Sequence, residues 1–392
     1  MSGPLEGIRV IDFTVMIAGP MATQILGEQG AEVIKVEPPM GGDRARRTGF
    51  RIGEFSAVFA AANLGKRSLA LNMMKPAGRA VFEKLVATAD VFVQNYRPGV
   101  MERMGIDEPA LRKLNPDLIY VSMSGYGETG PYAQRRAIDS VIQAISGTTA
   151  SQADEHGRPR LIQTTVCDKA TAWTAAQAIT AALFARDRGA GGQHIRISML
   201  AASAAFLWLD GGQRHSYLQE PGTPEPKRVG YLDVLQTAEG WVVVSAVDQP
   251  EFEAVCRACD REDLLEDPKL ADNAKRFENL GYLSNRLQEL VRDLSHEEIV
   301  RRFDAADVCY GFSNPLSEVH LDPQLVENGC FIEIEHPTGI ARHTRGAARF
   351  ENTPSDEPGA APQCGEHGEA ILAEIGLGAE EIAALKAEGT LG

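Results

Sequence analysis

Long hydrophobic runs are missing from this sequence. No stretch approaches the roughly 18 uninterrupted apolar residues of a membrane-spanning helix. The opening residues, MSGPLEGIRVIDF, also lack the basic segment and following apolar run of an export signal. We therefore expect a soluble, cytoplasmic protein with no membrane partner. Its 392 residues, 44% of them hydrophobic, still allow a sizeable core and favour two domains or one large domain with an insertion.

Positive charge is scarce as well. The chain has 39 Lys and Arg against 54 Asp and Glu, a net charge of -15 that would repel a nucleic-acid backbone, so nucleic acid is not expected as a partner. The basic residues of the first third are nevertheless grouped. This grouping favours a site for a small polyanion such as a nucleotide phosphate, although solvated surface arginines are the alternative for each member. The group comprises Arg44, Arg46, Arg47, Lys66, Arg67, Arg97 and Arg103.

Complete sets of metal ligands are also missing. The six cysteines are scattered, so a disulfide framework is not expected. Cys256 and Cys259 form one C-x-x-C, but no second pair completes a zinc site, and an amphipathic helix is the simpler interpretation. His336 and His343 are the nearest histidine pair, and we expect both to be structural or on the surface. The sequence therefore predicts no metal site.

What the sequence does contain, up to about residue 205, is an alternation of strand-like and helical segments. The strand-like segments are 8–13, 31–37, 68–73, 90–96, 118–124 and 194–200. Apolar residues recur at helical spacing between them, and this pattern is typical of βαβ units with a mostly parallel sheet. The strongest helix signal, 168–193, is rich in alanine, begins at Asp168 and ends in glycines.

Two passages rich in proline and glycine, 219–230 and 352–370, have the composition of linkers. After the first of them, 241–247 is strand-like, and two short helices are predicted on either side of Ser295, a residue suited to an N-cap. We therefore predict a second, smaller domain over about 226–325.

The loop after the fifth strand-like segment contains G-x-G-x-x-G, formed by Gly125, Gly127 and Gly130. A dinucleotide-binding fingerprint usually follows the first strand, with an acidic residue about twenty positions further on. Here Pro131 follows at once, and the residue twenty beyond Gly130 is Ala150. The motif is therefore a weak indication of NAD binding.

A different resemblance explains the loop together with other segments. The stretches GIRVIDFTVMIAGPMATQILGEQGAEVIKVEPP, NLGKRSLALNM, ADVFVQNYRPGVMERMGI, GYGETGPYAQRRAIDSVIQAISG and TAAQAITAALFARDRGAGGQHIRISML follow the order and spacing of class III coenzyme A transferases, the CaiB/BaiF family. The resemblance implies an α/β fold, with a Rossmann-like large domain, a smaller α+β domain and an interlocked homodimer. On this plan 1–220 is the first part of the large domain, 226–325 the small domain and 330–392 the segment that completes the large one.

The resemblance also implies a catalytic aspartate, and Asp168 occupies its position. A carboxylate can attack the thioester carbonyl of an acyl-CoA to give a mixed anhydride, which the expelled thiolate then attacks. The alternative is an acid that only stabilises the start of the following helix. Cys167 is a competing nucleophile, although no histidine near it in sequence would activate its thiol.

The resemblance further implies that CoA enters as a thioester substrate and that no cofactor is permanently bound. Arginine suits its phosphates because it donates charge-assisted hydrogen bonds in pairs. Backbone N–H groups of Gly125 and Gly127 could support the oxyanion formed at the thioester, or these glycines could simply form a tight turn. The implied CoA-binding residues are Val15, Met16, Ala18, Arg44, Lys66, Asn95, Tyr96, Arg103, Met104 and Arg136.

The chain departs from its relatives at some of these positions. Met16 stands where many members have glutamine, and Arg135 or Arg136 replaces a lysine common after the glycine loop. The glycine-rich loop of the oxalate and formate enzymes is missing, since Gly240 is the only glycine within YLDVLQTAEGW. On the relatives' plan, residues 228–240 face the acyl pocket. We expect the acceptor to be a small di- or hydroxycarboxylate, with succinyl-CoA as a plausible donor.

Two other functions remain open. An α-methylacyl-CoA racemase needs two opposed acid or base groups. Racemases supply one of them from the histidine of a Gly-His-Asp motif after the glycine loop, and the corresponding residues here are Ala137, Ile138 and Asp139. Isoleucine therefore stands in place of the histidine. A non-catalytic CoA-binding protein is the second alternative, against which the presence of Asp168 counts.

Overall fold

The computed structural model describes residues 3–53, 55–154, 156–212, 215–216, 218, 232 and 234–392. The chain divides into two compact units. The large unit comprises Met1–Ser216 with Gly329–Gly392, and the small unit comprises Tyr217–Asn328. The predicted linker 219–230 lies outside the described residues, as do residues 228–231 and 233 of the segment 228–240. None of the described helices is both long and apolar enough to cross a membrane.

The large unit is built on a six-stranded sheet in the order β5-β2-β1-β6-β7-β8. All its neighbouring strands are parallel, as the alternating sequence pattern predicts. Its strands are β1 (Arg9–Phe13), β2 (Glu32–Glu37), β5 (Arg67–Ala70), β6 (Val91–Gln94), β7 (Ile119–Ser124) and β8 (His194–Ser198). Strands such as β2, β6 and β7 are buried on both faces and therefore appear in the sequence as largely apolar runs.

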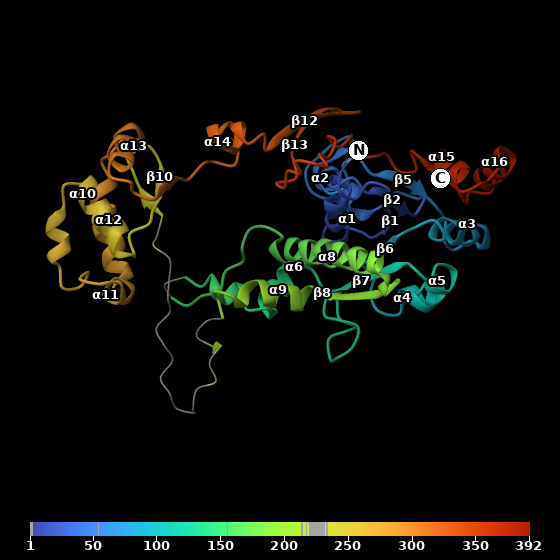
Figure 1. Ribbon diagram of the computed structural model, residues 1–392, viewed down its shortest axis with the longest axis horizontal. Helices are drawn as coiled ribbons and strands as arrows, with labels where there is room; N and C mark the ends of the chain where they lie inside the picture. The colour runs from blue at the N-terminus through green and yellow to red at the C-terminus, as the bar shows by residue number, and fades with distance from the viewer. Residues whose placement is uncertain are drawn as a thin grey trace. The chain divides into compact units, whose positions relative to one another are not determined.

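Helices cover both faces of this sheet (Figure 1). One core contains α1 (Ala18–Glu28) and α8 (Val166–Ala185), and its strand residues include Val10, Val91 and Val121. The opposite core takes the alternate strand residues, such as Ile11 and Phe92. Its helices are α3 (Pro76–Val86), α4 (Val100–Met104), α5 (Glu108–Leu114), α15 (Gly368–Glu374) and α16 (Ala379–Ala387). The C-terminal segment thus completes the core that residues near the N-terminus begin.

The long predicted helix is confirmed with shifted ends. It starts two residues before Asp168, and it gives way to the wide turn η2 (Arg186–Ala190), where Gly189 has a positive φ of 93°. Other elements of the large unit are η1 (Arg44–Arg47), β3 (Arg51–Ile52), β4 (Phe55–Ser56), α2 (Ala57–Ala61), α6 (Asp139–Ile145), α7 (Thr148–Ser151), α9 (Met199–Trp208), β12 (Phe331–His336) and β13 (Gly339–Thr344).

The small unit combines an antiparallel sheet, β11-β10-β9, with short helices around one hydrophobic core. Ser295 caps α13 as predicted, since its Oγ accepts the N–H of Glu298 at 3.2 Å. Cys256 lies in the amphipathic helix α10 and Cys259 ends it, as the simpler interpretation of the C-x-x-C expected. The elements are β9 (Leu235–Gln236), β10 (Trp241–Val244), α10 (Gln249–Ala258), η4 (Glu262–Glu266), α11 (Asn273–Glu278), α12 (Leu280–Val291), α13 (His296–Ala305), β11 (Tyr310–Phe312), η5 (Val319–Leu321) and α14 (Pro323–Glu327).

His336 and His343 belong to the β12–β13 hairpin of the large unit, and both are buried. Their Nε2 atoms are 3.0 Å apart, and burial lowers the pKa of each imidazole. The pair therefore forms a hydrogen bond inside the hairpin, which agrees with the structural role expected for it.

Candidate active site

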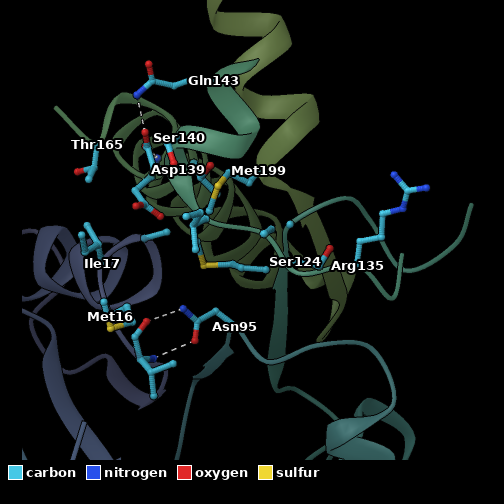
Figure 2. Close-up of a pocket in the computed structure, with 18 of the residues that line it drawn as sticks. Met16, Ile17, Asn95, Ser124, Arg135, Asp139, Ser140, Gln143, Thr165 and Met199 are labelled. Carbon is cyan, nitrogen blue, oxygen red and sulfur yellow. Dashed lines mark hydrogen bonds between the residues drawn. The ribbon is translucent and has the colours of Figure 1, made fainter. Parts of the chain in front are cut away.

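A cavity of about 610 Å³ opens at the carboxyl edge of the sheet, where β1 and β6 lie side by side. In the sheet, β2 lies beside β1 on one side of this pair and β7 lies beside β6 on the other side. The order of the strands therefore reverses between β1 and β6, which makes this boundary a topological switch point. Ligands of open α/β sheets usually bind at such a point. The cavity is lined by the turn after β1, the turn after β6, the end of β7 with the loop that leads to α6, the start of α6, residues 161–165 with the start of α8, and Met199 of α9 (Figure 2).

The turn after β1 is held in place by side chains from other segments. Asn95 accepts the N–H of Val15 at 2.9 Å and donates to its carbonyl oxygen at 2.8 Å, so one amide binds both polar groups of that backbone position (Figure 2). Met16 has a positive φ of 70°, which is unusual for a residue other than glycine. Its N–H donates to buried Asp43 at 3.1 Å, and Asp43 is paired with Lys35 at 3.0 Å. The cavity wall at Met16 therefore rests on a buried ion pair.

Asp168 lies in the first turn of α8, at the N-terminal end of a helix of 20 residues. Burial and the neighbouring Asp139 carboxylate together raise the pKa of Asp168 to about 7. Burial is the larger cause, since it disfavours the charged form, and the second negative charge adds to it. Near neutral pH a large share of Asp168 is therefore ionised, and its carboxylate is more basic, hence a stronger nucleophile, than that of an ordinary aspartate.

Asp139 is the nearest acidic partner of this group and opens α6. Its Oδ2 accepts the N–H groups of Cys167 and Asp168 at 2.8 and 3.0 Å. Its Oδ1 accepts from the side-chain amide of Gln143 at 2.6 Å, a bond visible in Figure 2. No role was predicted for Asp139 or Gln143 from the sequence. The one local signal was their i, i+4 spacing, which allows this pairing within a helix.

Cys167, the competing nucleophile, is 1% exposed and is not among the residues that line the cavity. Burial raises the pKa of its thiol, which keeps the thiol protonated and weakly nucleophilic. Its neighbour Asp168 lines the cavity, so the geometry favours the carboxylate.

The glycine loop contributes one of its two predicted residues. Gly125 lines the cavity, and a Cβ at this position would lie 2.2 Å from the Cβ of Ala137, so no side chain fits. Gly127 has a φ of 99°, and its N–H donates to Ser124 Oγ at 3.0 Å. This N–H is used inside the loop, which argues against the predicted contact of Gly127 with an oxyanion.

Of the ten predicted CoA-binding residues, half line the cavity and half do not. Lys66 is the clearest correction: its ammonium group is buried and donates to Asp12 at 2.8 Å as well as to three other oxygens. Met104 packs against the core, and Arg44, Arg103 and Arg136 are exposed elsewhere. The residues that do line the cavity are Val15, Met16, Ala18, Asn95 and Tyr96.

Two arginines that were not in that set reach the cavity instead. Arg97 follows Tyr96, and Arg135 stands one residue before the predicted Arg136. The Arg135 guanidinium lies 4.1 Å from the centre of the Tyr132 ring. In Figure 2 it extends away from the part of the cavity that contains Asp139. Together with Asp139 and Asp168, these arginines are the charged side chains among the described residues that line the cavity.

Comparison with known proteins identifies the class to which this fold and site belong. Residues 5–368 match the model of CoA-transferase family III, and the chain belongs to that family. It is therefore a CoA-transferase, an enzyme that acts on CoA thioesters and carboxylic acids.

Particular relatives agree with this assignment. The human succinyl-CoA:glutarate CoA-transferase is 34% identical, over 95% of this chain and 86% of that protein. The acetyl-CoA:oxalate CoA-transferase of Acetobacter aceti is 33% identical, over 95% and 96%. The structure of a CaiB/BaiF family protein from Brucella suis aligns with a TM-score of 0.84 at 29% identity, covering 96% of this chain and all of that one. The family resemblance expected from the sequence is thus confirmed.

Proposed function

We propose that the enzyme transfers CoA from an acyl-CoA to a carboxylic acid through covalent intermediates on Asp168. The observation that carries this proposal is the position of Asp168. Its carboxylate stands at a helix N-terminus, lines a cavity at the switch point of the sheet, and has a pKa raised to about 7. A carboxylate with these properties can act as a nucleophile near neutral pH.

In the first half of the reaction, an oxygen of the Asp168 carboxylate attacks the thioester carbonyl carbon. The carbon–sulfur bond breaks, CoA leaves as a thiolate, and a mixed anhydride with Asp168 remains. The thiolate then attacks the aspartyl carbonyl, which releases the donor acid as a carboxylate and leaves Asp168 bound to CoA as a thioester.

The second half reverses these steps with the acceptor. Its carboxylate attacks the aspartyl thioester, CoA again leaves as a thiolate, and the new anhydride is cleaved at the acceptor's own carbonyl. The products are the new acyl-CoA and free Asp168. Each step exchanges one carboxylate or thiolate for another, so the full cycle consumes no proton and needs no separate base.

Among the predicted contacts, those of the turns after β1 and β6 support a CoA site. Asn95 and Val15 fix the backbone of one wall, and Tyr96 packs against Phe13 with ring centres 5.4 Å apart. Exposed Arg97 and Arg135 provide positive charge at the same cavity, and guanidinium groups suit phosphates. We therefore assign the CoA phosphates to these two arginines, in place of Lys66 and Arg136.

For the acceptor we propose a small dicarboxylate, with succinyl-CoA as donor. Hydrogen-bonding side chains line the cavity next to Asp168 and Asp139, namely Ser140, Gln163, Thr164 and Thr165. Such groups can hold a short polar acid, whereas a long alkyl chain would leave them unpaired. The relatives named for succinate, glutarate and oxalate agree with this class.

We further propose that the enzyme is a homodimer, interlocked as the family resemblance implies. Large aromatic side chains on α8 and α9 are exposed in the single chain, including Trp173 at 59% and Phe206 at 66%. Exposed aromatic surface of this kind favours burial against a second copy. Light scattering after size exclusion should give twice the mass of the chain, and a monomeric mass would contradict the proposal.

The racemase alternative is weakened by the lining of the cavity. Ile138 is 62% exposed and has no acid or base function, and Asp139 uses its carboxylate in three hydrogen bonds. No histidine or lysine is among the described residues that line the cavity. Exchange of deuterium into the α-carbon of a 2-methylacyl-CoA, without transfer of CoA, would instead support a racemase.

The proposed chemistry can be tested on one peptide. Trypsin should release residues 161–169, which contain Cys167 and Asp168, between Arg160 and Lys169. After incubation with succinyl-CoA and reduction by borohydride, mass spectrometry should find Asp168 reduced at its carboxyl carbon. The Cys167→Ala variant should give the same product and Asp168→Asn none. An unmodified peptide with every acyl-CoA donor tried would contradict the covalent mechanism and favour the non-catalytic CoA-binding alternative.

A further inference from the structure

We propose that Asp139 is a positioning residue for Asp168: its carboxylate fixes the first turn of α8 and places a second negative charge beside the nucleophile. The inference rests on the proposed role of Asp168. It assigns a task to a side chain on a different helix, one that neither the sequence pattern nor the family's catalytic position indicates.

The first observation is that α8 does not cap itself. Its N-cap residue, Thr165, makes no side-chain hydrogen bond to the helix. The first N–H groups of a helix have no partner within it, and leaving them unpaired is costly. Asp139 provides the missing acceptor from α6, because one of its oxygens receives the N–H groups of both Cys167 and Asp168. The backbone of the nucleophile itself is therefore bonded to Asp139.

The second observation is that Asp139 is itself held in place. Gln143 donates to it at 2.6 Å and also donates to the carbonyl oxygens of Ile162 and Thr164, each at 3.2 Å. The amide oxygen of Gln143 accepts the N–H of Ile162 at 3.0 Å. Gln143 thus joins Asp139 to the segment that leads into α8, and these bonds restrict the orientation of the backbone at Asp168.

The third observation concerns charge. An N-terminal helix end stabilises one carboxylate, but here two carboxylates share it. Asp139 receives three hydrogen bonds, which hold its carboxylate in place, and its negative charge repels that of Asp168. The raised pKa of Asp168, caused by burial and then by Asp139, agrees with this geometry. Acylation of Asp168 removes its negative charge, and with it the repulsion. Asp139 therefore favours the covalent intermediates over the free carboxylate.

Other charged groups around the start of α8 do not replace this effect. Lys169 donates its ammonium group to Thr164 at 2.7 Å. Helix α9 carries no titratable side chain. On α1 the titratable side chain is that of Glu28, the last residue of the helix. On the neighbouring strands, Tyr120 is in the opposite core, and His194 and Arg196 lie beside Glu128. Arg97 and Arg135 line the cavity, and Asp139 is the one charged group that contributes to the pKa of Asp168.

A merely structural cap and a charged positioning residue predict different titrations. Asp139→Asn keeps an oxygen that can accept the backbone N–H groups but loses the charge, whereas Asp139→Glu keeps the charge. Enzyme labelled with ¹³C at its aspartate carboxyls would report the titration of Asp168, whose signal is identified by its loss in Asp168→Asn. We expect the midpoint to fall by about one pH unit in Asp139→Asn, the lower end of the effect of a close like charge, and to stay near the wild-type value in Asp139→Glu.

The rate of Asp168 acylation can be measured in single turnovers across the pH range. In Asp139→Asn the midpoint of this pH profile should fall by the same amount, and the maximal rate should be lower. An Asp168 midpoint that is unchanged in Asp139→Asn would overturn the inference. If that variant does not fold, Asp139→Thr offers the same comparison, since its neutral hydroxyl can also accept an N–H. Because the midpoint is measured without substrate, it tests the role of Asp139 separately, whereas failure of the wild-type enzyme to become acylated would contradict the proposed function.

Discussion

Lys66 donates its ammonium group to the carboxylate of Asp12 at 2.8 Å, with both side chains buried beneath the turn after β1. Asp12 also accepts the hydroxyl of Thr23 at 2.9 Å, and Lys66 donates to the same hydroxyl at 2.8 Å. One buried cluster of polar side chains therefore joins β1, α1 and the segment before β5. The residue expected to contact CoA instead supports the structure on which the cavity stands.

The first prediction follows from this arrangement. Replacing Lys66 by Met removes one partner of a buried ion pair and leaves the Asp12 charge without its closest cation. The free energy of unfolding should fall by about 3–5 kcal/mol, measured by urea titration. The control Arg44→Met, at an exposed arginine, should change it by no more than about 0.5 kcal/mol. A stable Lys66→Met enzyme with a raised KM for acyl-CoA would show instead that Lys66 binds substrate.

The second prediction concerns the pH dependence of catalysis. The pKa of Asp168 is raised to about 7, and the proposed attacking species is its carboxylate. The acylation rate should therefore be highest above pH 7 and fall about tenfold for each pH unit below it. Single-turnover measurements with succinyl-CoA would show this profile. A rate that stays constant down to the ordinary aspartate range would contradict the assignment of Asp168 as the group that must ionise.

The third prediction is that the same group costs stability. The pKa of Asp168 is higher in the folded protein than its ordinary value of 3.8, so the folded state holds this proton more tightly than the unfolded state does. The cost is absent below the ordinary pKa, grows as the pH rises and is complete above about 7. Above that pH, Asp168→Asn should stabilise the protein by on the order of 1–2 kcal/mol, less than a fully buried group would give.

Thermal unfolding of both proteins across the pH range would measure this difference. The gain should shrink as the pH falls towards the ordinary aspartate pKa. A variant that is less stable than the wild type at alkaline pH would indicate that the negative charge at the start of α8 stabilises the helix more than the Asp139 repulsion opposes it. The Asp187→Asn variant, at an exposed aspartate near the other end of α8, is a matched control.

The sheet and the long helix that carries Asp168 could be predicted from the sequence because their causes are local. Strands buried on both faces appear as apolar runs, and the alanine-rich helix is evident from its composition. Asp168 was predicted as the nucleophile because the family resemblance places a catalytic aspartate at this position. By contrast, the bond from the Asp168 N–H to Asp139 joins residues 29 positions apart and depends on how α6 packs against α8. No periodicity in the sequence encodes that packing.

The grouped basic residues illustrate the same limit. Lys66 and Arg97 contribute equally to a count of positive charge, yet one is buried and the other is exposed at the cavity. The difference arises because Lys66 immediately precedes β5 and reaches inward to Asp12, whereas Arg97 lies in the turn beyond the end of β6. Which basic side chains face a ligand is thus decided by tertiary structure.

The fourth prediction concerns the strained backbone at Met16. A φ of 70° is accessible to glycine without cost but is poor for a β-branched residue. Met16→Gly should leave the free energy of unfolding nearly unchanged, whereas Met16→Val should lower it by roughly 1–2 kcal/mol. Urea titration of the two variants would measure these changes. Equal stability of the two would mean that the turn relaxes, despite the bond from the Met16 N–H to Asp43.

The fifth prediction separates two adjacent arginines. Arg135 lines the cavity and lies over the Tyr132 ring, whereas Arg136 is exposed and outside the lining. If Arg135 binds a CoA phosphate, Arg135→Ala should raise the KM for acyl-CoA about tenfold, the effect of losing one charge-assisted hydrogen bond. The kcat should change little, because the reacting carbonyl is not touched.

Arg136→Ala is the matched control and should leave both constants close to those of the wild-type enzyme. Ionic strength gives an independent measurement, since salt screens an exposed arginine–phosphate contact. The KM of the wild-type enzyme should therefore rise with added salt more steeply than that of Arg135→Ala. The opposite result, a large effect of Arg136→Ala with little change in Arg135→Ala, would mean that the loop moves on binding CoA and that the register first expected from the sequence holds in the complex.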